Sequence, residues 1–142
     1  MKKGVRAEID YGALAEFRYE IRRYLSFSER AVDAAGIEPQ QHQALLAIKG
    51  LPRDAKATIG ALAERLQIQH HSAVELSNRL HSRGWIDRMR NSADRREVLV
   101  RLTRRGENLL LKLSIAHRDE LRTAGPRLIR ALRKVTRRNS RA

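Results

Sequence analysis

Hydrophobic residues recur every three or four positions between residues 10 and 35, which is the spacing of one face of an α-helix. Asp10 suits the cap of this helix and Gly36 its end. A second helical pattern covers residues 39–49 and begins with a proline, which favours a first helical turn. The turn-forming residues at 51–56 predict a loop after it.

Two shorter helical patterns follow, separated by only a few residues. Thr58 suits the cap of the first, whose apolar positions continue to Leu66. After turn residues at 67–69, the second runs to Gly84. Two short helices joined by a tight turn are typical of a helix-turn-helix, in which the second helix is free to lie in a major groove of DNA.

The periodicity then changes from helical to alternating. Residues 85–90 form a short segment, and Val98, Val100 and Leu102 alternate with other side chains. Between these segments, residues 91–94 read Asn-Ser-Ala-Asp, which favours a turn. The pattern predicts a β-hairpin directly after the helix-turn-helix, the arrangement called a wing.

A long helix is expected after Thr103, which suits its cap. We expect Gly125-Pro126 to break it and residues 128–135 to form a last helix, because proline lacks the N–H that a helix interior needs. Residues 137–142 are expected to be a flexible tail. The pattern predicts a mainly α-helical (α+β) fold with a small β-hairpin wing, in a single domain over residues 1–142.

The net charge indicates what kind of partner the protein binds. The chain has 30 Lys and Arg against 16 Asp and Glu, a net charge of +14. Residues 1–71 hold 11 basic and 9 acidic side chains, whereas residues 72–142 hold 19 and 7. Such a concentrated, arginine-rich surplus indicates a polyanion as partner. A basic surface that merely aids solubility is the alternative.

Several classes of function find no support in the composition. The chain has no cysteine, which excludes disulfides, thiolate zinc sites and cysteine nucleophiles. It has no nucleophile elbow and no phosphate-binding glycine loop, so we expect neither an enzyme nor a cofactor. No apolar run approaches the roughly 18 residues of a membrane span, and no signal-peptide core follows residues 1–4. We therefore expect a cytoplasmic protein.

Three stretches resemble the MarR family of bacterial regulators, named for multiple antibiotic resistance. They are the helix at 59–66, the second helix with the first wing strand at 72–80 and 83–86, and the wing with the start of the next helix. The third is the most specific. Its Asp94-Arg95-Arg96 matches the family's Asp-x-Arg wing, and its Leu102-Thr103-x-x-Gly106 matches the motif that opens that family's next helix.

The resemblance implies a homodimer. Residues 10–50 and 104–136 would form a helical dimerisation region, and residues 57–103 a winged helix-turn-helix lobe that binds double-stranded DNA. Relatives of this kind often respond to small aromatic or phenolic acids, which would then be the effector. Gln69 departs from the family pattern because Ser, Thr or Asp more often caps the recognition helix there.

The wing supplies the sharpest candidate site. We expect Arg96 to enter the minor groove, where narrow A·T-rich sequence concentrates negative potential. Asp94 would pair with a wing arginine and stabilise its direction, while Arg95 and Arg90 would contact phosphates. A hairpin that is merely soluble is the alternative.

The second helix of the pair supplies the other candidates. Five of its residues project away from the apolar face and would read base edges and phosphates: His70, His71, Ser72, Glu75 and Arg79. Arg79 is equally suited to pair with Glu75 one helical turn away. Glu75 also departs from the family pattern, because the family often has Arg or a neutral residue there. An acid repels phosphates, yet it can accept a hydrogen bond from cytosine.

The resemblance further implies a ligand cleft lined by Phe17, Arg23, Tyr24 and His42. The aromatic residues among them equally suit a dimer core. A zinc site formed by His42 and His117 is an alternative, but no second histidine lies one turn from either, so no metal is expected.

The C-terminal region is strongly basic. No acid follows Glu120, and seven basic residues come after residue 126. They are Arg127, Arg130, Arg133, Lys134, Arg137, Arg138 and Arg141. A solvated surface and a supplementary contact to the DNA backbone are the two interpretations.

Taken together, the sequence predicts a sequence-specific transcriptional regulator that acts as a homodimer on a pseudo-palindromic operator, most simply a ligand-responsive repressor. The alternatives are an architectural DNA-binding protein of low specificity, a regulator without a small-molecule effector, and an enzyme with a nucleic-acid substrate.

Overall fold

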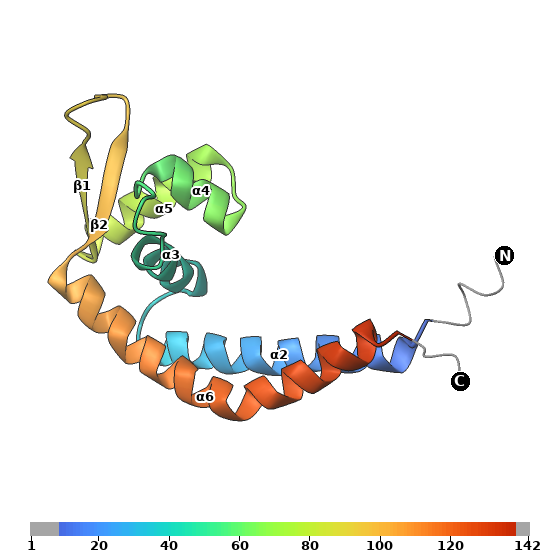
Figure 1. Ribbon diagram of the computed structural model, residues 1–142. Helices are drawn as coiled ribbons and strands as arrows, with labels where there is room; N and C mark the ends of the chain where they lie inside the picture. Colours follow the sequence, from blue (N-terminus) through green and yellow to red (C-terminus); the bar gives the residue numbers. More distant parts are fainter. Residues whose placement is uncertain (1–8, 139–142) are drawn as a thin grey trace, which may run out of the picture. The chain divides into compact units, whose positions relative to one another are not determined.

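The computed structural model of the chain describes residues 9–138. Within them the elements are α2 (Tyr11–Ala34), α3 (Pro39–Lys49), α4 (Ile59–Leu66), α5 (His70–Ser82), β1 (Ile86–Arg90), β2 (Val98–Leu102) and α6 (Arg104–Thr136) (Figure 1). The predicted fold class, mainly helical with one β-hairpin, is confirmed. Residues 137 and 138 follow the last helix without regular structure, and residues 139–142 of the expected tail lie outside the described residues.

The chain divides into two compact units. Among the described residues, unit 1 consists of residues 9–30 and 115–138, and unit 2 runs from Ala31 to Ser114. Unit 2 therefore holds the predicted helix-turn-helix and wing, and α3 packs within it against α4, α5 and β2.

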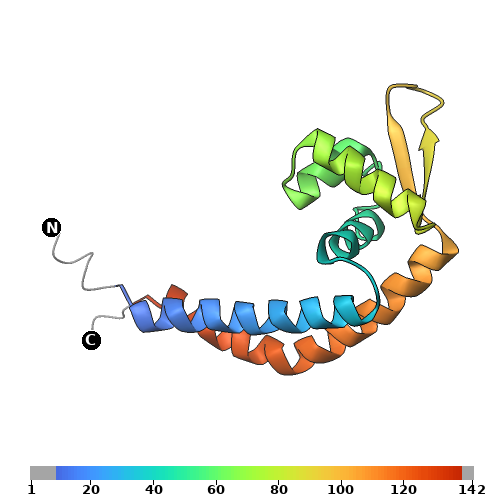
Figure 2. The ribbon, with the colours of Figure 1, turned by 180° about the vertical axis from the view of Figure 1, so that it is seen from behind.

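The expected break at Gly125-Pro126 is wrong. The final helix continues through Pro126 to Thr136 as one unbroken ribbon (Figure 2). Proline removes one backbone hydrogen bond from a helix interior. Ala124 and Ala131 lie two turns apart on one face and are 2% and 3% exposed, so the buried face runs through the proline without changing register. Continued packing of that face offsets the missing hydrogen bond.

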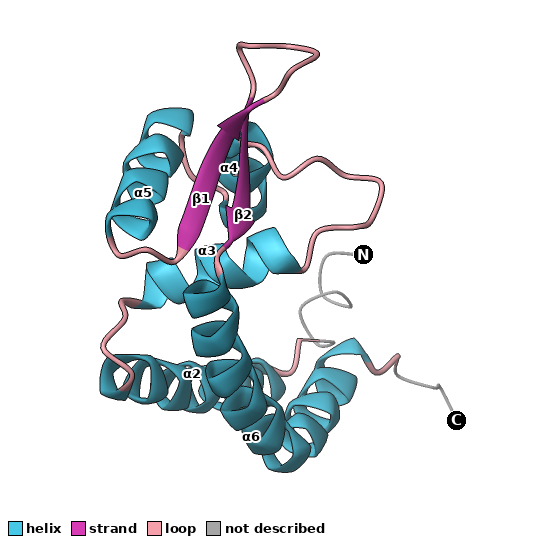
Figure 3. Ribbon diagram, turned by 90° about the vertical axis from the view of Figure 1, so that its left-hand side faces the viewer, coloured by secondary structure: helices cyan, strands magenta, loops and turns pink. Residues whose placement is uncertain are grey.

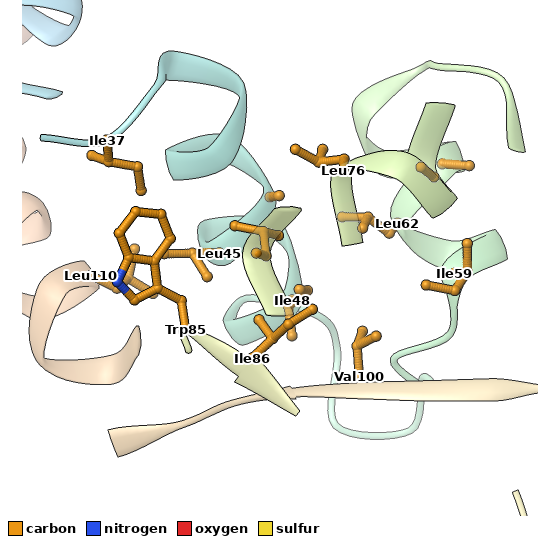
Figure 4. Packing of buried hydrophobic residues seen from close by; sticks show 14 of the residues in the cluster. Ile37, Leu45, Ile48, Ile59, Leu62, Leu76, Trp85, Ile86, Val100 and Leu110 are labelled. Atoms are coloured by element: carbon orange, nitrogen blue, oxygen red, sulfur yellow. The ribbon is translucent and has the colours of Figure 1, made fainter. Parts of the chain in front are cut away.

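The core of unit 2 collects apolar side chains from every element around it. Val32, Leu45, Leu62, Leu80 and Ile86 are almost completely buried. Figure 4 shows Leu45, Leu62 and Ile86 converging from α3, α4 and β1. Burying a side chain of this size contributes about 1.5–3 kcal/mol, so this core is what holds the short helices in place.

The tight turn between α4 and α5 forms as expected. Thr58 caps α4 by accepting a hydrogen bond from the Ala61 N–H at 3.0 Å. Gln67 ends the helix in the left-handed conformation at φ 54°, where its N–H is satisfied by the carbonyl groups of Ala63 and Glu64. Gln69 gives α5 no side-chain cap.

The wing is an antiparallel hairpin in which Ile86 pairs with Leu102 and Arg90 with Val98. Two backbone contacts that the alternating sequence pattern did not predict join the wing to the helix-turn-helix. Thr58 forms a single β-bridge with Leu99, and the Val100 N–H donates to the Ala57 carbonyl at 2.8 Å. The segment that opens α4 thus also acts as a short third strand beside β2.

Four residues join the end of α5, the wing and the start of α6. Gly84 has φ +74°, which favours glycine, and Thr103 Oγ1 donates to its carbonyl at 2.6 Å. The Thr103 N–H donates to the Trp85 carbonyl at 3.0 Å. A Cβ at Gly106 would lie 2.1 Å from that same oxygen. We call Gly84, Trp85, Thr103 and Gly106 the wing junction.

Unit 1 consists of the first part of α2 and the last part of α6, which contact each other through polar side chains. Ser28 Oγ and His117 Nε2 lie 2.8 Å apart, and Arg127 Nε donates to Glu20 Oε2 at 3.3 Å. Glu20 is 4% exposed in spite of its charge, which Arg127 and Arg23 both offset.

The wing junction generates a prediction about stability. Gly106→Ala should destabilise the protein by about 1–3 kcal/mol, the usual cost of overpacking, because backbone must move to admit the new methyl group. Urea unfolding at fixed protein concentration measures this.

Gly60→Ala is the matched control in the same unit, since the nearest atom to its Cβ would be Thr58 Oγ1 at an ordinary 3.7 Å. This variant should gain up to about 1 kcal/mol from helix propensity. Equal stabilities of the two variants would contradict the close approach at Gly106.

Candidate nucleic-acid interface

In unit 2, the outer face of α5 and the tip of the wing carry polar side chains that are exposed to solvent. The loop at residues 91–97 extends from the ends of β1 and β2 beyond α4 and α5 (Figures 1 and 3). An exposed helix beside a projecting hairpin is the arrangement by which winged helices read two grooves of DNA at once.

At the wing tip, Asp94 holds Arg96. One carboxylate oxygen, Asp94 Oδ1, accepts from the backbone N–H of Arg96 at 3.0 Å and from its Nε at 3.3 Å. The Arg96 side chain is 93% exposed. The carboxylate therefore fixes the start of the side chain and one edge of the guanidinium, while both terminal nitrogens stay available to another acceptor.

The rest of the loop is braced internally. Asn91 Nδ2 donates to Glu97 Oε2 at 2.7 Å, and the Asn91 N–H donates to the Glu97 carbonyl at 3.0 Å. Arg90 Nη1 donates to the Arg95 carbonyl at 2.8 Å, so this arginine supports the loop in addition to facing solvent. Arg95 is exposed. The bracing fixes the shape of the tip before any partner arrives.

The structure places the candidate residues of α5 on its outer face. His70, His71, Glu75 and Arg79 are exposed and Ser72 is half-buried, whereas Ala73, Leu76, Ser77 and Leu80 face the core. Among the ion pairs of the described residues, none joins Glu75 to Arg79. The Arg79 guanidinium is thus not held along the helix.

Sequence reasoning missed Arg88. This β1 residue donates from Nη1 to Asn78 Oδ1 on α5, and its Nη2 lies 3.4 Å from His81 Nδ1. Arg88 therefore ties the wing to the exposed side of α5. The sequence could have predicted which way Arg88 points. Ile86 and Arg88 lie two residues apart, so their side chains project from the same face of the strand.

A cavity of about 350 Å³ lies between the start of α4, α5 and the wing. Its polar lining includes His70, Arg88, Arg96 and Ser77. The Ser77 hydroxyl is fully buried and has no hydrogen-bond partner among the described residues. The wing and α5 thus enclose a space lined by cations as well as apolar groups.

The residues proposed for a ligand cleft fall in both units. In unit 1, Phe17 and Tyr24 are half-buried, and Arg23 lies 5.5 Å from the centre of the Tyr19 ring and 3.5 Å from Glu20 Oε1. Burial raises the pKa of the Tyr24 hydroxyl. In unit 2, His42 lies on α3 and is 5% exposed.

His117, the second histidine of the zinc alternative, lies in unit 1 against Tyr24, Phe27 and Ser28. Within residues 9–138 no three His, Cys, Asp or Glu side chains gather in a way that could hold a metal ion. The same part of the chain contains no helix whose length and hydropathy would let it span a bilayer.

Residues 35–97 match the model of the MarR family. The family resemblance is confirmed over these residues, which contain the helix-turn-helix and most of the wing. The fold is that of solved MarR-family structures over 80–89% of the chain. No curated protein matches the sequence significantly.

Solved structures extend the likeness of fold beyond the matched stretch. An S. aureus MepR mutant bound to an oligodeoxyribonucleotide is similar at 21% identity, with 82% of each chain covered and a TM-score of 0.66. A second S. aureus MepR mutant gives 20% identity over 84% of this chain and 85% of the other, with a TM-score of 0.71. Wild-type E. coli MarR in its apo form gives 23% identity, coverage of 89% and 84%, and a TM-score of 0.62.

The wing geometry yields a direct prediction. In Asp94→Ala, the backbone N–H of Arg96 loses its acceptor, and its hydrogen exchange should accelerate by about fivefold or more, the equivalent of roughly 1 kcal/mol. NMR measures the exchange at that amide.

Asp54→Ala is the charge-matched control, because Asp54 lies in the exposed loop after α3. The control should leave exchange at Arg96 unchanged. Unchanged exchange in Asp94→Ala as well would show that the carboxylate does not hold the wing tip.

Proposed function

We propose that this protein is a sequence-specific DNA-binding regulator that acts as a homodimer, most simply as a repressor. The observation that carries the proposal is the wing tip, where Asp94 holds a 93% exposed Arg96 beside the polar outer face of α5. A guanidinium fixed at the end of a projecting loop suits a narrow minor groove, whose negative potential attracts arginine.

In this proposal α5 lies in the major groove. His70, His71, Ser72 and Glu75 would then face base edges or phosphates, and Glu75 would favour cytosine by accepting from its amino group. Arg90 and Arg95 would contact phosphates on either side of the inserted Arg96. Base contacts on α5 specify sequence, while the wing contacts fix orientation.

The homodimer is supported by apolar surface on unit 1. Tyr19 and Leu25 on α2, and Ile129 and Leu132 on α6, are each 45–51% exposed. Exposed apolar patches of this kind mark interaction surfaces, and each buried side chain of this size contributes about 1.5–3 kcal/mol. A second copy of the chain supplies a matching apolar surface, and its two winged helices would then bind half-sites about 10 bp apart.

Ligand response is the part of the proposal that rests on the family resemblance alone. The candidate residues are Phe17, Arg23 and Tyr24 in unit 1 and His42 in unit 2. A small aromatic acid that changes operator affinity would support it, and a regulator without an effector is the alternative.

A test of the DNA-binding proposal begins with a random pool of duplexes, from which the chain should enrich one motif. Affinity for that duplex should exceed affinity for random DNA by about a thousandfold or more at matched salt. Equal affinities would favour the architectural alternative, and turnover of nucleic acid would favour an enzyme.

On the enriched duplex, Arg96→Ala should weaken binding by about 10-fold to 100-fold, in the range of 1–3 kcal/mol expected for a specific arginine contact. Arg122→Ala is the charge-matched control, because this arginine pairs with Asp119 in unit 1. If the two variants bind equally, Arg96 does not contact DNA.

The homodimer is tested by sedimentation equilibrium. Leu132→Glu should weaken self-association by about 10-fold to 100-fold, because a charge replaces a side chain worth roughly 1.5–3 kcal/mol when buried. Thr123→Glu adds the same charge at an exposed polar position of the same helix and should leave association unchanged. Equal association of both variants would contradict this interface.

A further inference from the structure

We propose that the end of α6 has a second DNA-binding surface, which contacts the phosphate backbone and is separate from the winged helix. We call it the α6 basic stripe. It consists of Arg130, Arg133 and Lys134 on the helix and of Arg137 and Arg138 directly after it. This proposal goes beyond the function proposed above, because the stripe lies in unit 1 and its binding to DNA does not need the wing.

The spacing of these residues places them together. Arg133 and Lys134 lie three and four residues after Arg130 in α6, and such residues are neighbours on a helix surface. Arg137 and Arg138 follow directly after the helix ends at Thr136. From Arg130 to Thr136 the helical rise is roughly 9 Å, at about 1.5 Å per residue. Duplex DNA carries about five phosphate charges over that length, so the three cations of this segment and the two that follow it have a comparable charge.

No side chain within residues 9–138 forms an ion pair with these cations. By contrast, Arg118 and Arg122 share Asp119, and Arg127 pairs with Glu20. Glu16 and Glu20 line a cavity together with Arg130 and Lys134, and neither acid pairs with either cation.

The apolar residues of the same segment leave Arg130 and Lys134 free. Ala131 is buried, and Ile129 and Leu132 belong to the surface proposed for the second copy. At about 100° per residue, Leu132 is turned roughly 160° from Arg130 and Lys134. Ile129 is turned about 100° or more from both, whereas Arg133 lies within about 40° of Ile129. Dimer formation would therefore leave Arg130 and Lys134 exposed, with Arg133 at the edge of the dimer surface.

Duplex DNA fits this surface better than an anionic membrane does. A helix that binds a membrane buries its own apolar face among the lipids. Here Ala124 and Ala131 are already buried within the protein, and the exposed Ile129 and Leu132 belong to the surface proposed for the second copy. Four of the five cations are arginines, whose planar guanidinium groups bind phosphate oxygens in pairs.

The experiment uses the full chain in which Arg90, Arg95 and Arg96 are replaced by alanine, so that the wing cannot dominate binding. Residual affinity for a random duplex is measured by fluorescence anisotropy at several salt concentrations. Adding Arg130→Gln, Arg133→Gln and Arg137→Gln should lower the slope of log affinity against log salt by about 3, near 0.9 for each lost phosphate contact.

The control makes the same change in net charge on α2, with Arg18→Gln, Arg22→Gln and Arg30→Gln, all at exposed positions. The control should keep the slope, and circular dichroism should show equal helix content in both. Equal slopes for the two triple variants would overturn the proposal.

A further measurement tests whether the partner of the stripe is DNA or an anionic lipid. Vesicles containing phosphatidylserine should bind the stripe variant and the α2 control alike. Vesicle binding that is lost only in the stripe variant, with DNA binding intact, would overturn the assignment to DNA. Failure of the wing variants to weaken operator binding would overturn the proposed function and leave this test unaffected.

Discussion

The wing junction is the constraint on which the DNA-binding unit depends. The carbonyl of Trp85 accepts the Thr103 N–H, and the same oxygen lies where a Cβ of residue 106 would be. Gly84 adopts a conformation that favours glycine and accepts the Thr103 hydroxyl. Because α5, both strands and α6 meet at these residues, the direction of the wing relative to α5 follows from this backbone packing.

Side-chain contacts beyond the wing junction position the polar surface of α5 and the wing. Arg88 on β1 donates a hydrogen bond to Asn78 on α5. The hairpin and the helix are therefore linked at a second point, in addition to the wing junction. Beyond it, Asp94 positions Arg96 and Glu97 secures Asn91. Preorganisation of this kind reduces the entropy lost on binding, since fewer side chains must be ordered when the partner arrives.

The sequence predicted the elements because each had a local physical signal. The change from helical to alternating periodicity located the wing, and Thr58 and Gly84 marked helix ends that the structure contains. The continuous α6 was not predicted, because the local effect of Pro126 is to disrupt a helix, whereas the packing of Ala131 is a tertiary effect. Contacts between distant segments, such as Thr58 with Leu99, leave no periodic signal in either segment.

The central claim is that two winged helices read duplex DNA, each with α5 in a major groove and Arg96 in a flanking minor groove. Hydroxyl-radical footprinting on an enriched duplex tests it most directly, since the radical reports minor-groove and backbone contacts along each strand. The account predicts two protected half-sites about one helical turn apart, with flanking protection that disappears in Arg96→Ala. Uniform protection along the duplex, or flanking protection that persists without Arg96, would contradict it.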